Sequence, residues 1–350
     1  MDKIYIEDCC EILDSLRVPI TASDREEGEY PYYGANGIQD YVAGYIFDDE
    51  LVLLAEDGGN FGSKERPIAY RVSGKCWVNN HAHVLKPKKG LDVDYLCYAL
   101  MFYKVDGMIN GATRQKLTQS AMRKMQIPNR SENEQKYIVD ELDKIVKIKE
   151  LRQTELNLLD NLIKGRFVEM FGDPVLATKE EKLELSELCE KITDGEHGGV
   201  ERITQGHPFL NAKHIQKNGS IDWSTITFIG DADHRRIYKR CNPEKGDILL
   251  TTTGTIGNVA IMPEYEEVSM DRGITLLKIN HKKVTSEFMA EMLKQESIQI
   301  QMGANVHASA IGHLFMNKVK KLPAILPAME KQMEFTRFVQ QVNKSKVVSS

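Results

Sequence analysis

The feature that most constrains this chain is an internal duplication. The segment Glu50–Gly58 (ELVLLAEDG) is matched by Gly246–Gly254 (GDILLTTTG), 196 positions later. Gln135 is likewise matched by Gln332, 197 positions later, each just after a basic, proline-containing stretch. Solenoid repeats are only a few tens of residues long, so these copies must be whole domains. Two diverged copies of one binding surface indicate a protein that binds two different targets at a fixed separation.

Length and composition describe a soluble protein with two ordinary cores. The chain has 350 residues, of which 41% are hydrophobic and 28% charged, which leaves room for two domains. No apolar run approaches the roughly 20 residues of a membrane span. The first ten residues, MDKIYIEDCC, carry acids where a secretory signal would be basic and then apolar. Six cysteines occur, none in a C-x-x-C pair, so we expect a cytoplasmic protein with reduced thiols and no metal.

The charge distribution points to nucleic acid even though the net charge is −5. Residues 107–131 and 302–329 contain no Asp or Glu at all. Their basic residues and histidines are Arg114, Lys116, Arg123, Lys124, Arg130, His307, His313, Lys318, Lys320 and Lys321. One basic window could be an ordinary solvent-exposed face that arose by chance. An acid-free basic window in both copies fits better with a surface that binds along the phosphates of a nucleic acid.

Both halves combine short strands with one helix before the basic window, which predicts an α+β fold. In the first half, strands are predicted at Leu51–Ala55 and Pro67–Val72, with a helix at Asp92–Lys104. The second half repeats this order. Its predicted strands are Ile248–Thr252, Val259–Met262 and Ile274–Ile279, and its predicted helix is Ser286–Met302.

A very long helix is predicted between the halves. Ser131 and Glu134 form a capping box at its start, and Gly172-Asp-Pro174 ends it. Its apolar stripe includes Ile138, Leu142, Ile145, Leu156, Leu159, Ile163 and Phe167. About 40 residues span roughly 60 Å, too long to be buried within one domain. The stripe therefore requires a partner helix alongside, as in a coiled coil, and a second helix begins near Glu330.

The order of these features resembles the specificity (S) subunit of type I restriction–modification systems. The resemblance rests on Tyr33-Gly-Ala-Asn-Gly37, on the run Gly246–Gly257 and on Phe171-Gly-Asp-Pro174. It also rests on the Gly111-Ala-Thr and Gly303-Ala-Asn loops and on the two glutamines that open the helices. The resemblance covers essentially the whole chain, and the duplication of these motifs in the same order makes it specific.

The resemblance implies two target recognition domains in a pseudo-twofold repeat, each followed by a helical spacer. The implied segments are a first recognition domain at 1–130, a spacer helix at 131–174, a second recognition domain at 175–328 and a second helix at 329–350. Each recognition domain would bind one half of a split, asymmetric sequence in double-stranded DNA. The chain itself would be non-catalytic and bind no cofactor. Methyltransferase (M) subunits would carry S-adenosylmethionine, and restriction (R) subunits would use ATP and Mg²⁺.

The sequence departs from the family pattern in its second helix, which has only 15–20 residues after Glu330. We therefore expect that Leu156, Leu159, Ile163 and Phe167 are incompletely covered. The exposed stripe would then drive self-association or dependence on a methyltransferase subunit. A truncated, regulatory S subunit and a stand-alone sequence-specific DNA-binding protein are the alternative functions.

Catalytic motifs are not found. The loop Asp57–Lys64 fails the phosphate-loop spacing, and Asn242-Pro243-Glu244 lacks the second proline of an amino-methylation motif. His81 and His83 alternate on a predicted strand without a nearby ligand cluster, so a structural or DNA-facing role is favoured over a metal.

Candidate DNA contacts are polar or basic residues in glycine-rich turns and in the basic windows, where backbone can approach phosphates and side chains can reach base edges. The acids beside Gly58 suit cytosine amino groups better than phosphates. The candidates are Asn36, Asn60, Asn79, Asn80, His81, Arg114, Lys116, Asn211, Lys213, His214, Thr253, Thr255, Asn258, Asn305, His307, Lys320 and Lys321. Ordinary loop polarity is the alternative interpretation for each.

Overall fold

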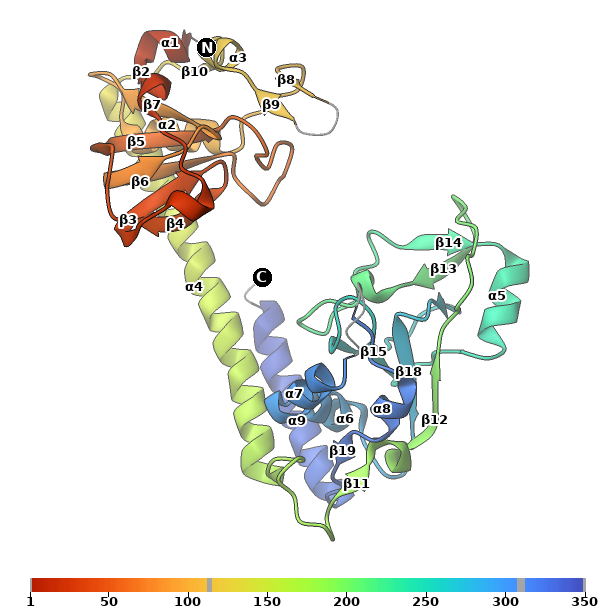
Figure 1. Cartoon of the computed structure of the whole chain (residues 1–350). Coiled ribbons are helices and arrows are strands. Elements are labelled where there is room, and N and C mark those ends of the chain that lie inside the picture. Colours follow the sequence, from red (N-terminus) through yellow and green to blue (C-terminus); the bar gives the residue numbers. More distant parts are fainter. Residues whose placement is uncertain (1, 112–114, 307–311, 349–350) are drawn as a thin grey trace. The chain divides into compact units, whose positions relative to one another are not determined.

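The computed structural model describes residues 2–111, 115–306 and 312–348, in two compact units, Met1–Leu151 and Arg152–Ser350 (Figure 1). The division falls inside the predicted long helix, which is observed as α4 (Glu132–Phe171). The sequence predicts four segments, which meet where the predicted local structure changes. The boundaries of these four segments stay a prediction. Among the described helices, none is both long and apolar enough to cross a membrane.

Unit 1 is built on a six-stranded sheet in the order β2-β7-β5-β6-β3-β4. Its strands are β2 (Cys10–Ile12), β3 (Glu27–Gly34), β4 (Gly37–Val42), β5 (Phe47–Ala55), β6 (Ala69–Val78) and β7 (Ala82–Pro87). Strand β5 is buried along Leu51–Ala55, as expected for an apolar run bounded by polar turns. Shorter strands are β1 (Lys3–Tyr5), β8 (Ile109–Asn110), β9 (Lys116–Leu117) and β10 (Gln126–Pro128).

Helices cover the apolar side of this sheet. They are α1 (Ile6–Cys9), α2 (Val93–Met101) and α3 (Gln119–Arg123). Asp92 caps α2 by accepting the backbone N–H groups of Asp94 and Tyr95, and Leu96 and Leu100 of α2 are fully buried in the core. The strand predicted at Leu51–Ala55 and the helix predicted at Asp92–Lys104 are confirmed within a few residues, whereas the strand predicted at Pro67–Val72 continues to Val78.

Unit 2 repeats the plan with a four-stranded sheet, β12-β18-β15-β16, and a three-stranded sheet, β14-β13-β17. The strands are β11 (Leu183–Glu184), β12 (Cys189–Asp194), β13 (His207–Leu210), β14 (Thr227–Ile229), β15 (Ile248–Thr251), β16 (Val259–Ile261), β17 (Ser269–Met270), β18 (Ile274–Ile279) and β19 (Pro323–Ala324). The helices are α5 (Asp231–Tyr238), α6 (Ser286–Leu293), α7 (Glu296–Ala304), α8 (Met316–Lys320) and α9 (Met329–Val348).

The strand register shows that the duplication is structural. Leu54 of β5 pairs with His83 of β7, and Leu250 of β15 pairs with Thr275 of β18 in the same way. One prediction is wrong: the single helix expected at Ser286–Met302 is two helices, because the backbone turns to an extended conformation at Gln295. No glycine or proline marks this break in the sequence.

A buried glutamine joins the start of α4 to the start of α2 in unit 1. The Gln135 side chain is 3% exposed. Its Oε1 accepts the backbone N–H of Asp92 at 2.7 Å, and its Nε2 donates to the carbonyls of Gly90 and Arg130, each at 2.9 Å. The amide thereby ties three backbone segments together.

The same arrangement recurs in unit 2. Gln332, which is fully buried, accepts the N–H of Thr285 at 3.0 Å and donates to the carbonyls of Lys283 and Pro327 at 2.9 and 2.8 Å. Thr285 is the N-cap of α6, as Asp92 is of α2. We call these two networks the glutamine clamps. They fix the start of each long helix on its own recognition domain.

The second half of α4 packs against α9 within unit 2. Phe167 and Phe171 of α4 contact Phe335 of α9, with ring centroids 5.6 and 5.5 Å apart. Arg166, near the end of α4, pairs with Glu334 near the start of α9 at 3.2 Å. The two helices are therefore antiparallel, and Figure 1 shows them side by side.

One expectation about the long helix is wrong. The residues that a short partner was expected to leave uncovered are Leu156, Leu159, Ile163 and Phe167. In the structure Ile163 and Phe167 are buried, Leu159 packs against the same core, and Leu156 is half-buried. Because α9 starts beside the end of α4, it runs past these residues first. Other apolar residues of α4 are exposed. Ile145, Ile148 and Leu151, at 61%, 66% and 57%, lie earlier in the helix, whereas Leu158 and Leu162, at 63% and 51%, lie among the covered residues.

We expect Gln332→Leu to lower the free energy of unfolding of unit 2 by about 2 kcal/mol, because the Thr285 N–H and two carbonyls lose their buried partner. Urea unfolding followed by the fluorescence of Trp223, the tryptophan of unit 2, measures this effect. The control is Gln340→Leu, which removes an exposed contact to Glu287 and should change stability by less than about 0.5 kcal/mol. Equal effects of the two substitutions would contradict the role of the clamp.

Candidate nucleic-acid interface

In unit 1, the chain leaving β5 is joined to the basic window by backbone hydrogen bonds. The N–H of Leu117 donates to the carbonyl of Glu56 at 2.7 Å, and the N–H of Gly58 donates to Gln115 at 3.3 Å. Asp57 and Lys116 are thereby paired across the junction. Gly58 has a φ of +62°, a backbone conformation that favours glycine.

Unit 2 builds the same junction. The N–H of Leu314 donates to Thr252 at 2.9 Å, the N–H of Gly254 donates to Gly312 at 3.4 Å, and Thr253 is paired with His313. We call this junction the loop bridge: residues 56–58 with 115–117 in unit 1, and residues 252–254 with 312–314 in unit 2. The two bridges match at offsets of 196 and 197 positions, the offsets that the sequence shows.

Charged side chains support the loop bridge of unit 1. Glu56 accepts Arg17 at 2.7 Å and Lys116 at 2.9 Å. His83 lies between Asp14 Oδ2, at 2.7 Å from Nδ1, and the carbonyl of Leu117, at 2.8 Å from Nε2. Asp14 also accepts the Val84 N–H and the Gln119 amide.

These contacts keep the two buried carboxylates ionised. Burial opposes ionisation of Asp14, but the hydrogen bond and charge of His83 outweigh it and hold the pKa of Asp14 below its ordinary value. Burial likewise opposes ionisation of Glu56, and the hydrogen bonds from Arg17 and Lys116 outweigh it, so the pKa of Glu56 is also lowered. The loop bridge of unit 1 therefore rests on a network of buried ion pairs.

In unit 2, uncharged threonine hydroxyls occupy the positions that are equivalent to Glu56 and His83. Thr252 stands where Glu56 stands, and Thr275 stands where His83 stands, by the same strand register. Both threonines are buried, and their Oγ1 atoms lie 3.3 Å apart. Thus the two bridges share a backbone but not the chemistry beneath it.

Asp14, Glu56 and His83 could in principle bind a metal ion, since their ligand atoms lie within 4.8 Å of one another. Arg17, Lys116 and Gln119 already donate to the carboxylate oxygens of this group. Two cations so close would oppose a third positive charge. We therefore interpret the group as an ion-pair network, and the expected absence of a metal stays a prediction.

Three of the unit 1 candidates meet at the loop bridge. Asn36, exposed at the turn between β3 and β4, donates to the carbonyl of Gly58 at 2.9 Å. His81 Nδ1 lies 2.6 Å from Asp57 Oδ1, and Lys116 belongs to the bridge itself. Elsewhere, Asn79 is buried and donates to Gln39, Asn60 donates to the carbonyl of Pro67, and Asn80 is exposed. Arg114 lies outside the described residues.

The unit 2 candidates are more dispersed. Thr253 contacts His313 at 2.7 Å, and Thr255 is exposed in the same loop. Asn258 donates to the carbonyl of Ile215 at 2.8 Å. His214 is buried between the Asn211 N–H and the carbonyl of Thr225, so its position is that of a core residue rather than an exposed reader of bases.

The remaining candidates lie on the surface or outside the described part of the chain. Lys213 is exposed beside His214, and Asn305 donates to the Gln301 carbonyl at the end of α7. Lys320 and Lys321 are exposed at the end of α8. His307 lies outside the described residues. Which of these side chains touch DNA stays a prediction.

Sequence reasoning missed the residues that support the bridges. Asp14 and Arg17 lie about 40 residues before Glu56 in a segment without a recognisable motif, and only the sheet brings them together. His313 could have been found, because the repeat offset of 197 aligns it with Lys116.

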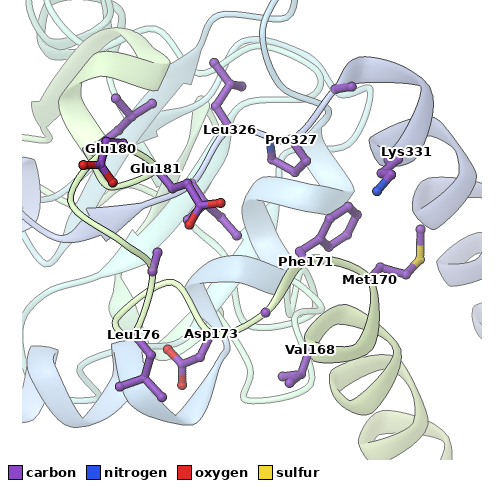
Figure 2. Close-up of a pocket in the computed structure, with 15 residues that line it drawn as sticks. Val168, Met170, Phe171, Asp173, Leu176, Glu180, Glu181, Leu326, Pro327 and Lys331 are labelled. Carbon is purple, nitrogen blue, oxygen red and sulfur yellow. The ribbon is translucent and has the colours of Figure 1, made fainter.

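A groove of about 860 Å³ lies at the end of α4 in unit 2, away from the residues of the loop bridge (Figure 2). Val168, Phe171, Leu176 and Leu326 give it apolar walls, and Leu176 is 80% exposed. Asp173, Glu180, Glu181 and Lys331 also line it, so the groove combines apolar walls with three carboxyl groups and one ammonium group.

Comparison with known proteins identifies the class to which this arrangement belongs. The family model of the type I restriction modification DNA specificity domain matches residues 1–161 and again 182–347. The chain belongs to this family, with one copy of the domain in each half.

Individual relatives agree. A Haemophilus influenzae protein, provisionally described as a type I restriction enzyme specificity subunit, is 28% identical over 341 residues, covering 93% of this chain and 83% of that protein. The EcoBI specificity subunit of Escherichia coli is 29% identical over 105 residues, 30% of this chain and 22% of its own. The fold is similar to the crystal structure of the S subunit from M. genitalium, with a TM-score of 0.50 at 15% identity, covering 99% of this chain and 90% of that chain.

We expect acidification to unfold unit 1 before unit 2. The depressed pKa values of Asp14 and Glu56 mean that these carboxylates stabilise unit 1 at neutral pH and lose this effect as the pH falls through their folded-state values. In unit 2, burial raises the pKa values of Asp247 and Asp271, so protonation there favours the folded state.

Each unit contains one tryptophan, Trp77 and Trp223, which makes the comparison direct. The Trp223→Phe chain reports on unit 1 and the Trp77→Phe chain on unit 2 during titration from about pH 7 to about pH 3. In the Trp223→Phe background, Asp14→Asn should make the acid transition less steep. A Trp223 signal that changes before the Trp77 signal would contradict the assignment.

Proposed function

We propose that this chain is the DNA-reading, non-catalytic subunit of a type I restriction–modification complex, and that its two units bind the two different halves of a split target in double-stranded DNA. The observation that carries the proposal is the loop bridge, which is built twice on one backbone with different side chains. Because side chains read base edges, two such surfaces support an asymmetric target rather than a palindrome.

Catalysis is assigned to partner subunits. The methyltransferase subunits would bind S-adenosylmethionine, and the restriction subunits would use ATP and Mg²⁺. Among the described residues of both units, the polar clusters support loops and helix starts. The ion-pair network and the glutamine clamps are examples. This use of polar groups supports a scaffold that positions DNA and partners.

The exposed apolar residues of α4 support a docking surface for a methyltransferase subunit. Ile145, Ile148 and Leu151 lie within seven residues of one another on α4 and are more than half exposed. Covering each would contribute roughly 1.5–3 kcal/mol. A stand-alone DNA-binding regulator, the second candidate function, would not need such a stripe. The groove in Figure 2, whose apolar walls are accompanied by three carboxyl groups and one ammonium group, would suit a basic, apolar segment of the same partner.

The first test is the methylated sequence. Co-expression with the cognate methyltransferase subunit, followed by sequencing for N6-methyladenine, should give a motif of two unlike parts separated by unspecified bases. A continuous or palindromic motif would contradict the proposal.

Duplicating residues 144–150, where α4 is exposed on most sides, should lengthen the unspecified gap by about three base pairs, since seven residues add roughly 10 Å. An altered half-site with an unchanged gap would show that α4 does not set the distance.

The second test concerns docking. Replacing Ile145 and Ile148 together with Ser should leave the unfolding midpoint nearly unchanged, because both side chains are already exposed. Affinity for the methyltransferase subunit, measured by calorimetry, should fall at least about tenfold. Lys149→Ser, at the exposed position that follows Ile148, is the control and should bind normally. Unchanged affinity of the double variant would place the docking surface elsewhere.

A further inference from the structure

We infer that the residue pair at each loop bridge sets the base preferred at one position of the half-site read by that unit: Asp57 with Lys116 in unit 1, and Thr253 with His313 in unit 2. The inference rests on the proposed function, because it takes each unit to read one half of the DNA target. It adds the reading residues and the chemistry that each presents.

The two pairs occupy the same place on the same backbone. In each unit, two backbone hydrogen bonds of 2.7–3.4 Å hold the pair together, and the pair borders an acid-free window. Side chains at this place differ completely between the units: a carboxylate and an ammonium group in one, a hydroxyl and an imidazole in the other. A shared backbone with exchanged side chains is what independent selection of two base preferences would produce.

The pair in unit 1 contains a hydrogen-bond acceptor, the Asp57 carboxylate, which is in contact with His81. Asp57 Oδ1 lies 2.6 Å from His81 Nδ1, and the Asp57 side chain is 18% exposed. Lys116, whose side chain is 48% exposed, is held at 2.9 Å by Glu56. An ionised carboxylate only accepts hydrogen bonds, so Asp57 suits the amino group of cytosine or adenine in the major groove. Lys116 beside it can contact a phosphate.

Unit 2 presents a neutral ring. His313 Nδ1 lies 2.7 Å from Thr253 Oγ1, and the ring packs edge-on against Phe315, with centroids 4.8 Å apart. Burial, and to a smaller extent the positive charge of Arg272, hold the pKa of His313 below its ordinary value. The contact with Thr253 allows either tautomer of the ring; in the one that the inference takes, the hydroxyl donates to Nδ1, and Nε2 carries the proton and is a donor. Such a donor suits the O6 or N7 acceptor of guanine.

The support beneath each pair matches its chemistry. Under the charged pair, buried Glu56 contacts Lys116, half-buried Arg17 and buried His83, whereas Thr252 and Thr275 lie beneath the neutral pair. Exchanging whole pairs between units would therefore also disturb the core. Substitutions that keep the shape of the side chain but change its donors and acceptors test the inference without this disturbance.

The experiment uses the full chain with its methyltransferase subunit and a pool of DNA duplexes in which either half-site is randomised. Bound duplexes are sequenced for the wild type, Asp57→Asn and His313→Phe. We expect Asp57→Asn to reduce discrimination at one position of one half-site by about tenfold, and His313→Phe, which keeps a ring but removes its donor, to do so at one position of the other half-site, since a good base contact discriminates by about tenfold or more. Lys116→Gln should instead weaken binding across sequences and reduce the salt dependence by about one unit of slope.

The matched control is Glu264→Gln, the same carboxylate-to-amide change at an exposed residue that pairs with Lys245; its selected sequences should equal those of the wild type. Trp77 and Trp223 fluorescence verifies that each variant is folded. Identical selected sequences for Asp57→Asn and wild type, or relaxation of both half-sites by one substitution, would overturn the inference. Failure of the proposed function would look different, because then the wild type itself would select no two-part sequence.

Discussion

The buried glutamine at the start of each long helix is the contact on which the architecture depends. Gln135 and Gln332 use both the acceptor and the donor of their amide on backbone groups from separate segments. Leaving those groups unpaired in the core would be costly, so each helix leaves its recognition domain in one direction only. The arrangement is the same in both copies, so each copy consists of a domain together with the helix that follows it.

Helix α4 serves two purposes along its length. Its second half is part of the core of unit 2, where Phe167 and Phe171 pack against Phe288 and Phe335. Its middle turns expose Ile145, Ile148 and Leu151 to solvent. A helix buried at one end and apolar but exposed in the middle is suited to a protein that is completed by another subunit.

The two recognition domains show how one fold reads two sequences. The backbone hydrogen bonds of the loop bridge are kept, while both the exposed pair and the buried residues beneath it change from charged to uncharged. Buried ion pairs are stable only when every charge has partners, and Arg17, Lys116 and His83 supply these in unit 1. Once such a network exists, changing one member alone leaves a buried charge unpaired, so the support and the pair above it must change together.

The sequence by itself determined the duplication, the α+β class, the 40-residue helix with its capping box, and the family, because these depend on local periodicity, capping residues and repeated motifs. Through the acid-free window it also named Lys116 as a candidate, which the structure places in the loop bridge. Only the tertiary structure decided that α9 covers Ile163 and Phe167. The apolar stripe of a helix does not by itself determine the direction in which a partner helix runs along it. Likewise, Asp14, Arg17 and His83 meet Glu56 only because neighbouring strands bring distant segments together, and no local pattern marks such a contact.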